Sequence, residues 1–202
     1  MKGDDFLLIK TLVVGQLETN CYVVTDEDTL MCAIIDPGAE SGTILDYLES
    51  NSLTAKAIFL THGHFDHYMA LGAVREATGA PVYINRRDTA AGGDEAAQGH
   101  KMPDTGDLLF YSEGDVLSVG GLEFHVMETP GHSAGSVTLR CEDALFTGDT
   151  LFRDSCGRTD LGGDMDTMLG SLRRLSALEG DWEVYPGHAE STTLDRERRF
   201  NY

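Results

Sequence analysis

The residues best suited to chemistry lie in one short stretch, from Thr61 to His67, with the sequence THGHFDH. Three imidazoles and one carboxylate fall within six residues. Neutral imidazole and carboxylate groups bind zinc, iron or manganese. A catalytic ion keeps an open position, so four such groups are more than one tetrahedral ion would take from one segment. The stretch therefore predicts a metal site, and a solvated histidine-rich loop is the alternative interpretation.

A comparable pattern occurs three more times along the chain. Apolar runs lead into Thr129-Pro130-Gly131-His132, Thr147-Gly148-Asp149 and Pro186-Gly187-His188. In each segment a glycine beside the ligating residue lets the backbone bend sharply at the end of a strand. Because open α/β folds place ligands at the carboxyl ends of strands, the four segments could converge at one edge of a sheet. Together they would supply five histidines and two aspartates: His62, His64, Asp66, His67, His132, Asp149 and His188.

Seven ligands fit two ions better than one ion. Three protein ligands for each ion and one shared carboxylate use all seven and leave a bridging position for water. Two dications, two aspartates and one hydroxide leave a local charge of roughly +1, although the protein is acidic. Such ions lower the pKa of a bound water to about 7 and polarise a carbonyl oxygen. The predicted chemistry is hydrolysis at an electrophilic carbonyl or phosphorus. The remaining histidines are expected to be solvated (His100) and structural (His125).

The elements that position these residues follow from the periodicity of apolar residues. The predicted strands are 6–14, 21–25, 30–35, 57–60, 81–84, 116–119, 122–127, 136–141, 144–147 and 183–185. The predicted helices are 41–49, capped by Ser41; 68–78, with Met69, Leu71 and Val74 on one side; and 165–178, with Met168, Leu172, Leu175 and Leu178 in the core. Gly120-Gly121 predicts a tight hairpin, and residues 88–112 predict a long loop. The pattern indicates two sheets covered by helices in one α/β domain.

The composition favours a single globular domain. The chain has 202 residues, of which 41% are hydrophobic and 24% are charged. A formal net charge of -19 argues against a nucleic-acid partner and against an anionic membrane surface. The four cysteines form no CxxC pair, and we find neither a signal peptide nor a run of membrane-spanning length. These features favour a reducing compartment, so we expect a cytoplasmic protein.

The motifs resemble those of the metallo-β-lactamase-fold hydrolases and, within them, the short glyoxalase II-like (hydroxyacylglutathione hydrolase-like) members. The shared segments cover nearly the whole chain: 19–22 (TNCY), 35–38 (IDPG), 62–67, 129–133 (TPGHS), 147–149 (TGD), 157–160 (GRTD) and 186–188 (PGH). The resemblance implies an αββα sandwich spanning residues 1–202 as one domain, with the metals at one edge.

The resemblance also implies how the ligands are divided. The first ion would be held by His62, His64 and His132; the second ion by Asp66, His67 and His188; and Asp149 would bridge. Zinc is the favoured metal, with iron or manganese as alternatives. The implied reaction is hydrolysis of a small anionic acyl thioester by a metal-bound hydroxide that the catalytic residue Asp66 would orient. An iron-dependent persulfide dioxygenase on the same fold is the alternative function.

Substrate recognition is less constrained by the sequence. Arg158 could meet a substrate carboxylate, and an ion pair with Asp160 is an equal alternative. Cys156 could border the pocket, although a packing role is favoured. Because the sequence reaches Tyr202 shortly after His188, we expect the protein to lack the helical domain that supplies glutathione-binding residues in glyoxalase II. We therefore expect the 88–112 loop and Arg158 to set substrate choice. The oligomeric state is not indicated.

Overall fold

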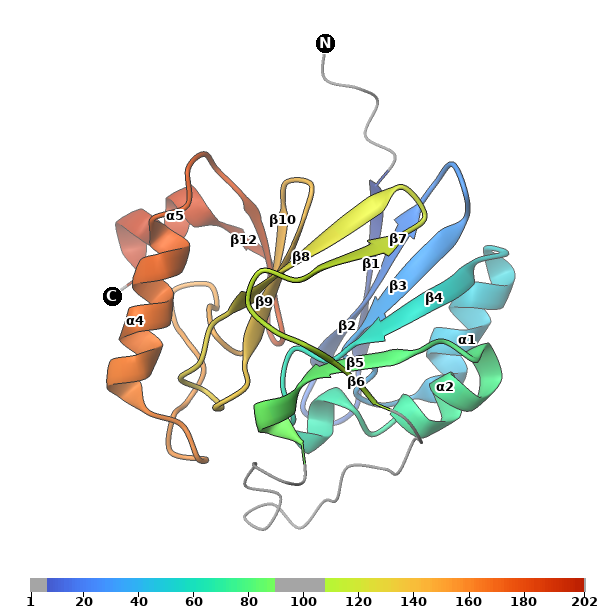
Figure 1. Cartoon of the computed structure of the whole chain (residues 1–202), viewed down its shortest axis with the longest axis horizontal. Helices are drawn as coiled ribbons and strands as arrows, with labels where there is room; N and C mark the ends of the chain where they lie inside the picture. The colour runs from blue at the N-terminus through green and yellow to red at the C-terminus, as the bar shows by residue number, and fades with distance from the viewer. Residues whose placement is uncertain (1–6, 90–107, 202) are drawn as a thin grey trace.

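The structure, a computed structural model, describes residues 7–89 and 108–201 and contains two six-stranded mixed sheets (Figure 1). The first sheet, in spatial order, consists of β1 (Leu7–Val14), β2 (Thr19–Asp26), β3 (Met31–Ile35), β4 (Thr54–Phe59), β5 (Val82–Asn85) and β6 (Leu109–Tyr111). The second consists of β12 (Thr192–Thr193), β11 (Glu183–Pro186), β10 (Ala144–Gly148), β9 (Val137–Cys141), β8 (Leu122–Glu128) and β7 (Val116–Val119).

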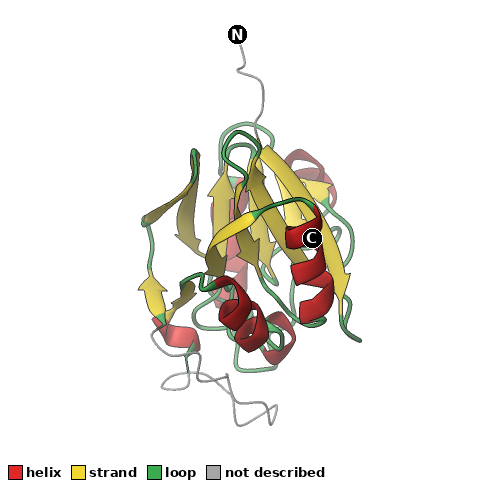
Figure 2. Ribbon diagram, turned by 90° about the vertical axis from the view of Figure 1, so that its right-hand side faces the viewer, coloured by secondary structure: helices red, strands yellow, loops and turns green. Residues whose placement is uncertain are grey.

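Helices cover the outer face of each sheet. In Figure 1, α1 (Ser41–Ser50) and α2 (Leu71–Thr78) lie against the first sheet, and α4 (Met165–Ser176) and α5 (Leu194–Phe200) lie against the second. Figure 2, turned by 90°, shows helices in front of the strands. Two single turns of 3-10 helix, η1 (Phe65–His67) and η2 (Arg86–Asp88), follow β4 and β5. The αββα arrangement expected from the sequence is confirmed.

Strand β2 shows how the sequence builds these layers. Successive side chains of a strand point to opposite faces, and all eight residues of β2 are buried. Cys21 and Val23 pack with residues of α1 and α2, whereas Tyr22 and Val24 pack between the two sheets. Because β2 is covered on both faces, its central residues 21–24 form an apolar run without alternation, so periodicity locates the strand only approximately.

Aromatic side chains fill much of the space between the sheets. Phe59 of the first sheet packs on Phe124 of the second, with ring centroids 5.0 Å apart. Tyr22 lies edge-on to Phe146 at 5.3 Å. A separate cluster, which includes Leu175 and Leu194, joins the second sheet to α4 and α5. The sheets are thus held against each other, so their adjoining strand ends form a defined edge.

Several predicted details are corrected by the structure. Helix α2 begins at Leu71 rather than residue 68, and Met69 is 56% exposed instead of packing with Leu71 and Val74. Ser41 does not cap α1, because Glu40 precedes the helix in a left-handed conformation without a side-chain cap. The predicted 88–112 loop contains the end of η2 and strand β6. The rest of that loop, including His100, lies outside the described residues.

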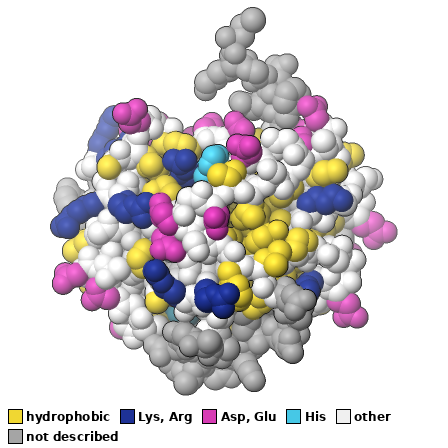
Figure 3. Space-filling model, in the orientation of Figure 1, with side chains coloured by type: hydrophobic (Ala, Val, Ile, Leu, Met, Phe, Trp, Pro, Cys, Tyr) yellow, Lys and Arg dark blue, Asp and Glu magenta, His cyan; other side chains and the backbone are white. Residues whose placement is uncertain are grey.

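The Gly120-Gly121 hairpin is confirmed, since Val119 pairs with Leu122 across a two-residue turn. The short elements β12 and α5 were not predicted. Within the described ranges, no helix is long and apolar enough to span a membrane. Figure 3 shows one face of the molecule, where charged side chains of both signs surround an apolar area.

Candidate metal centre

The four segments singled out by sequence meet at one edge of the paired sheets. They follow β4, β8, β10 and β11, and each leaves the end of a strand whose side chains are largely buried. The structure brings all seven predicted side chains together in three overlapping groups, within each of which the candidate ligand atoms lie within 4.8 Å of one another. These groups are His62, His64 and His132; His62, His67 and Asp149; and Asp66, His67 and His188.

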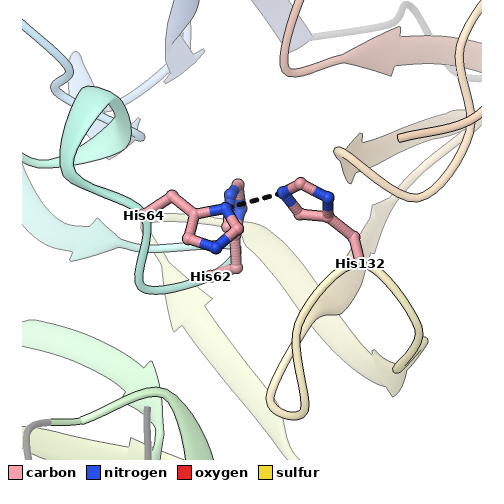
Figure 4. Close-up of side chains that lie close together, drawn as sticks. All are labelled: His62, His64 and His132. Carbon is pink, nitrogen blue, oxygen red and sulfur yellow. Dashed lines mark hydrogen bonds between the residues drawn. The ribbon is translucent and has the colours of Figure 1, made fainter. Parts of the chain in front are cut away.

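The first group consists of three imidazoles that point toward one another (Figure 4). His64 Nδ1 lies 2.7 Å from His132 Nε2. The ring centroid of His62 is 4.8 Å from those of both His64 and His132. Three nitrogen atoms converging from two loops form an arrangement that could hold one cation.

Asp66, His67 and His188, called the second group from here on, combine a carboxylate with two imidazoles. Asp66 Oδ2 lies 3.2 Å from His188 Nε2 and 3.6 Å from His67 Nε2. Asp149 lies between the two groups, because its Oδ1 is 3.5 Å from His67 Nε2 and its Oδ2 is 3.4 Å from His132 Nε2. This placement fits a carboxylate shared by two ions.

Four of the imidazoles have a polar partner at Nδ1, which leaves Nε2 directed into the centre. Such partners fix the ring orientation of metal-binding histidines. A carbonyl or carboxylate partner also places the proton on Nδ1. The contacts are His62 with Thr61 Oγ1 at 3.1 Å, His67 with Asp36 Oδ2 at 2.9 Å, His132 with the Arg158 carbonyl at 2.6 Å and His188 with the Leu17 carbonyl at 3.0 Å.

Asp36 is a supporting residue that the sequence reasoning did not single out. Its buried carboxylate accepts hydrogen bonds from the Thr61 amide at 2.8 Å and the Thr61 hydroxyl at 2.7 Å, besides its contact with His67. Its φ of 52° is in the left-handed region, which is costly for a residue with a side chain. The shared segment 35–38 (IDPG) contains Asp36, but only the structure shows where its carboxylate points.

The charges and burial around the site shift the pKa values of several of these groups. Burial opposes protonation of His67, but Asp36, Asp149 and Asp66 outweigh it and raise the pKa of His67 to about 9. Burial, reinforced by the neighbouring His67, lowers the pKa of His62. Burial would raise the pKa of Asp66, but the hydrogen bond with His188 and the charge of His67 lower it below the usual carboxyl range.

The seven residues fit a metal centre on a structural criterion. Three of their buried atoms, His62 Nε2, His67 Nε2 and Asp149 Oδ1, have no hydrogen-bond partner among the described residues. Buried polar atoms are nearly always paired, since leaving one unpaired costs about 1–3 kcal/mol. All three atoms are directed into the same centre, where a cation would pair them.

Glycine beside a candidate ligand has a specific reason at Gly187. A Cβ at this position would lie 2.2 Å from Asp149 Oδ1 and 2.7 Å from His67 Cε1. Only a residue without a side chain allows the strand end to approach these groups so closely. Close approach, more than a sharp bend, therefore explains the Pro186-Gly187-His188 segment.

The same corner joins the two sheets. The side-chain amide of Asn20, in β2, donates to the carbonyls of Pro186 and Ala189, both at 2.9 Å. The Tyr22 hydroxyl donates to the Pro186 carbonyl at 2.5 Å. His188 is thus held by the first sheet, although it follows a strand of the second.

Arg158 and Cys156 lie on the loop after Asp149. The Arg158 guanidinium is exposed and makes two 2.7 Å hydrogen bonds to Asp160, so the ion pair considered for it is present. Its carbonyl, by contrast, orients His132. Cys156 is half-buried.

An open pocket of about 520 Å³ adjoins Asp66, with Leu17, Phe65 and Met69 in its wall.

Comparison with known proteins agrees with this geometry. A family model described as the metallo-beta-lactamase superfamily matches residues 14–188. The hydroxyacylglutathione hydrolase GloC of Haemophilus influenzae is 32% identical over 204 residues, which cover 96% of each chain. The probable metallo-hydrolase YqgX of Bacillus subtilis is 36% identical over 203 residues, which cover 95% of each chain.

Solved structures show the same fold. The B3 metallo-beta-lactamase BLEG-1 has a TM-score of 0.88 and 36% identity, covering 96% of this chain and 98% of its own. ETHE1 from Myxococcus xanthus has a TM-score of 0.83 and 32% identity, and the match covers 96% of this chain and 83% of the ETHE1 chain. TTHA1623 in a di-iron-bound form has a TM-score of 0.81 and 36% identity, and the match covers 95% of this chain and 98% of the TTHA1623 chain. The chain therefore belongs to the metallo-beta-lactamase superfamily, whose members are mostly metal-dependent hydrolases.

Proposed function

We propose that the protein hydrolyses small acyl thioesters at a dinuclear metal centre. The observation that carries this proposal is the pair of side-chain groups that meet at Asp149. His62, His64 and His132 would hold one ion; Asp66, His67 and His188 would hold the other; and Asp149 would contact both. When bound, two divalent ions would supply Lewis acidity and acidify a water molecule. The donor set of imidazole and carboxylate suits zinc, iron or manganese.

Asp66 is the candidate for orienting the water that attacks the substrate. Its Oδ2 accepts a hydrogen bond from the Thr19 hydroxyl at 3.3 Å and faces His188. With its pKa lowered, Asp66 stays ionised at neutral pH and acts as an acceptor. An ionised acceptor holds a water O–H and so directs the lone pair of the oxygen toward the carbonyl carbon.

The thioester assignment rests on leaving-group chemistry and on similarity to GloC. A thiolate leaves readily, so cleavage needs no strong general acid; amides and alkyl esters demand more. The pocket beside Asp66 could receive the apolar part of a small substrate, because Leu17, Phe65 and Met69 contribute to its wall. Arg158 could bind a substrate anion only after exchanging its two contacts with Asp160.

The decisive experiment measures release of free thiol from a panel of small thioesters, including lactoylglutathione, with and without a chelator. We expect chelator-sensitive release from at least one substrate, and turnover of lactoylglutathione that is detectable without being the fastest. The Arg158→Ala variant tests recognition: a raised KM for anionic thioesters alone would support contact with a substrate carboxylate. Absence of thiol release from every thioester would contradict the proposal.

Persulfide dioxygenation is the second candidate, and it is favoured by similarity to the structure of ETHE1, which belongs to that class. Hydrolysis consumes no oxygen, whereas dioxygenation does. Oxygen uptake with glutathione persulfide, together with iron as the metal that supports activity, would favour this candidate. Metal analysis of protein purified without added metal complements both assays.

A further inference from the structure

We propose that Asp88 is a positioning residue for the first group, His62, His64 and His132. Asp88 is the last residue of η2, which follows β5, and it is only 7% exposed. Among the described residues, its carboxylate is hydrogen-bonded to Gly63, Ser133 and Gly135 and to none of the three imidazoles. Its carboxylate instead joins the loop that carries His62 and His64 to the loop that carries His132. This inference rests on the metal centre and not on the identity of the substrate.

The contacts of Asp88 reach both loops. Its Oδ2 accepts a hydrogen bond from the Gly63 amide at 2.8 Å and from the Ser133 hydroxyl at 2.5 Å. Its Oδ1 accepts from the Gly135 amide at 2.6 Å. Gly63 lies between His62 and His64, and Ser133 follows His132 directly. One carboxylate therefore fixes the backbone on both sides of the first group.

Two glycines make room for Asp88, which is an independent sign that its position matters. A Cβ at Gly63 would lie 2.3 Å from the Asp88 carbonyl oxygen, and a Cβ at Gly135 would lie 2.6 Å from Asp88 Oδ1. Neither glycine has a left-handed φ, so backbone conformation does not require glycine at either position. Space around Asp88 is the requirement that the structure shows.

The second group is fixed by other contacts. His67 is oriented by Asp36, and His188 by the Leu17 carbonyl. Loss of the Asp88 carboxylate should thus let His64 and His132 separate while Asp66, His67 and His188 keep their places. Small displacements of ligands weaken metal binding, since outer-shell partners affect affinity by about 10–100-fold. A selective effect on one of two ions is what distinguishes positioning from general stabilisation.

Asp26 provides a matched control. It is also buried at 4% exposure, and it accepts three hydrogen bonds, from the Thr29 hydroxyl at 2.5 Å, the Gly121 amide at 2.8 Å and the Asp28 amide at 3.1 Å. It ends β2, whose opposite end, Thr19, contacts Asp66. The strand has eight residues, so the control lies roughly 23 Å from that contact.

The test is titration of the metal-free full chain with cobalt(II), monitored by visible absorption, for the wild type and for Asp88→Asn, Ser133→Ala and Asp26→Asn. His64→Ala and His188→Ala supply the reference spectra of proteins that lack a ligand of the first or the second group. We expect Asp88→Asn to bind one ion at least tenfold more weakly, leaving a one-ion spectrum that matches His64→Ala. Ser133→Ala should change in the same direction by less, and Asp26→Asn should keep the wild-type titration.

The outcomes separate the claims. If the wild type binds no cobalt, the metal centre itself is refuted. If the wild type binds two ions and Asp88→Asn binds both with unchanged affinity, or loses both equally, the positioning role is refuted and only stabilisation of the loops remains. If Asp88→Asn does not fold, Ser133→Ala decides: an unchanged titration in that variant overturns the proposal, and selective weakening of the first ion supports it.

Discussion

Replacing Gly187 with alanine would place a methyl group against the Asp149 carboxylate and the His67 ring. The new Cβ would lie 2.2 Å from Asp149 Oδ1, whereas ordinary van der Waals contact begins at 3.4 Å. If the carboxylate alone yields, it moves by about 1.2 Å, the difference of these distances. A misplacement of about 1 Å in a catalytic site can lower the rate by about 10²-fold. That factor corresponds to about 2.7 kcal/mol in the activation free energy.

The assay for Gly187→Ala is kcat/KM for the best thioester, with metal content and Tm measured on the same preparation. We expect about 10²-fold lower kcat/KM and weaker metal binding in a folded protein, because the φ of Gly187 lies outside the left-handed region. Gly170→Ala is the control: it lies within α4 with no atom near its new Cβ, so it should stabilise by about 0.5–1 kcal/mol with unchanged activity. Wild-type activity and metal content in Gly187→Ala would refute the account of close approach.

Four further outcomes are expected. Asp149→Ala should lower metal content and abolish thiol release while the circular dichroism spectrum stays native-like; full activity would remove Asp149 from the centre. Chelation should lower Tm, because ions that bind only the folded state stabilise it by about 2.7 kcal/mol at a hundredfold excess over Kd; an unchanged Tm would contradict a centre that binds its ions tightly. Phe124→Ala should cost about 3–5 kcal/mol in urea unfolding, because its ring is fully buried between the sheets; a loss below 1 kcal/mol would contradict that packing. Donation by the Thr29 hydroxyl and the Gly121 amide lowers the pKa of Asp26 below its ordinary 3.8, so its stabilising effect is present above that pH and lost as pH falls further; Asp26→Asn should flatten the acid limb of the Tm profile, and an unchanged limb would count against it.

The layers and the candidate ligands could be predicted from the sequence for identifiable reasons. Each candidate ligand follows an apolar run and a turn signal, so local pattern alone marks Asp149 and His188 as side chains at strand ends. The αββα layering is what the resemblance to the metallo-β-lactamase-fold hydrolases implies, and that resemblance rests on motifs in a fixed order along the chain. Comparable local patterns follow four predicted strands, and bringing them together required only one assumption about the fold, that the strand ends share one edge.

The supporting residues could not be predicted in this way. Asp36 and Asp88 resemble ordinary turn residues in the sequence, and their importance depends on which distant groups their carboxylates meet. Met69 has the spacing of a core residue but lies before the first turn of α2, so its exposure depends on the 3-10 turn that ends at His67. Local periodicity carries no information about such long-range contacts or about the residue at which a helix begins.

The joint between Asn20 and Pro186 has a consequence for how the protein matures. The two residues are 166 positions apart, so forming their contact closes a loop of nearly the whole chain. Loop closure of this kind is entropically costly and tends to slow folding. During synthesis, His62 and His64 emerge long before His188, and the second group stays incomplete until the second sheet docks. We therefore expect metal to bind only after both sheets have assembled. Metal binding would then stabilise the folded protein without initiating its folding.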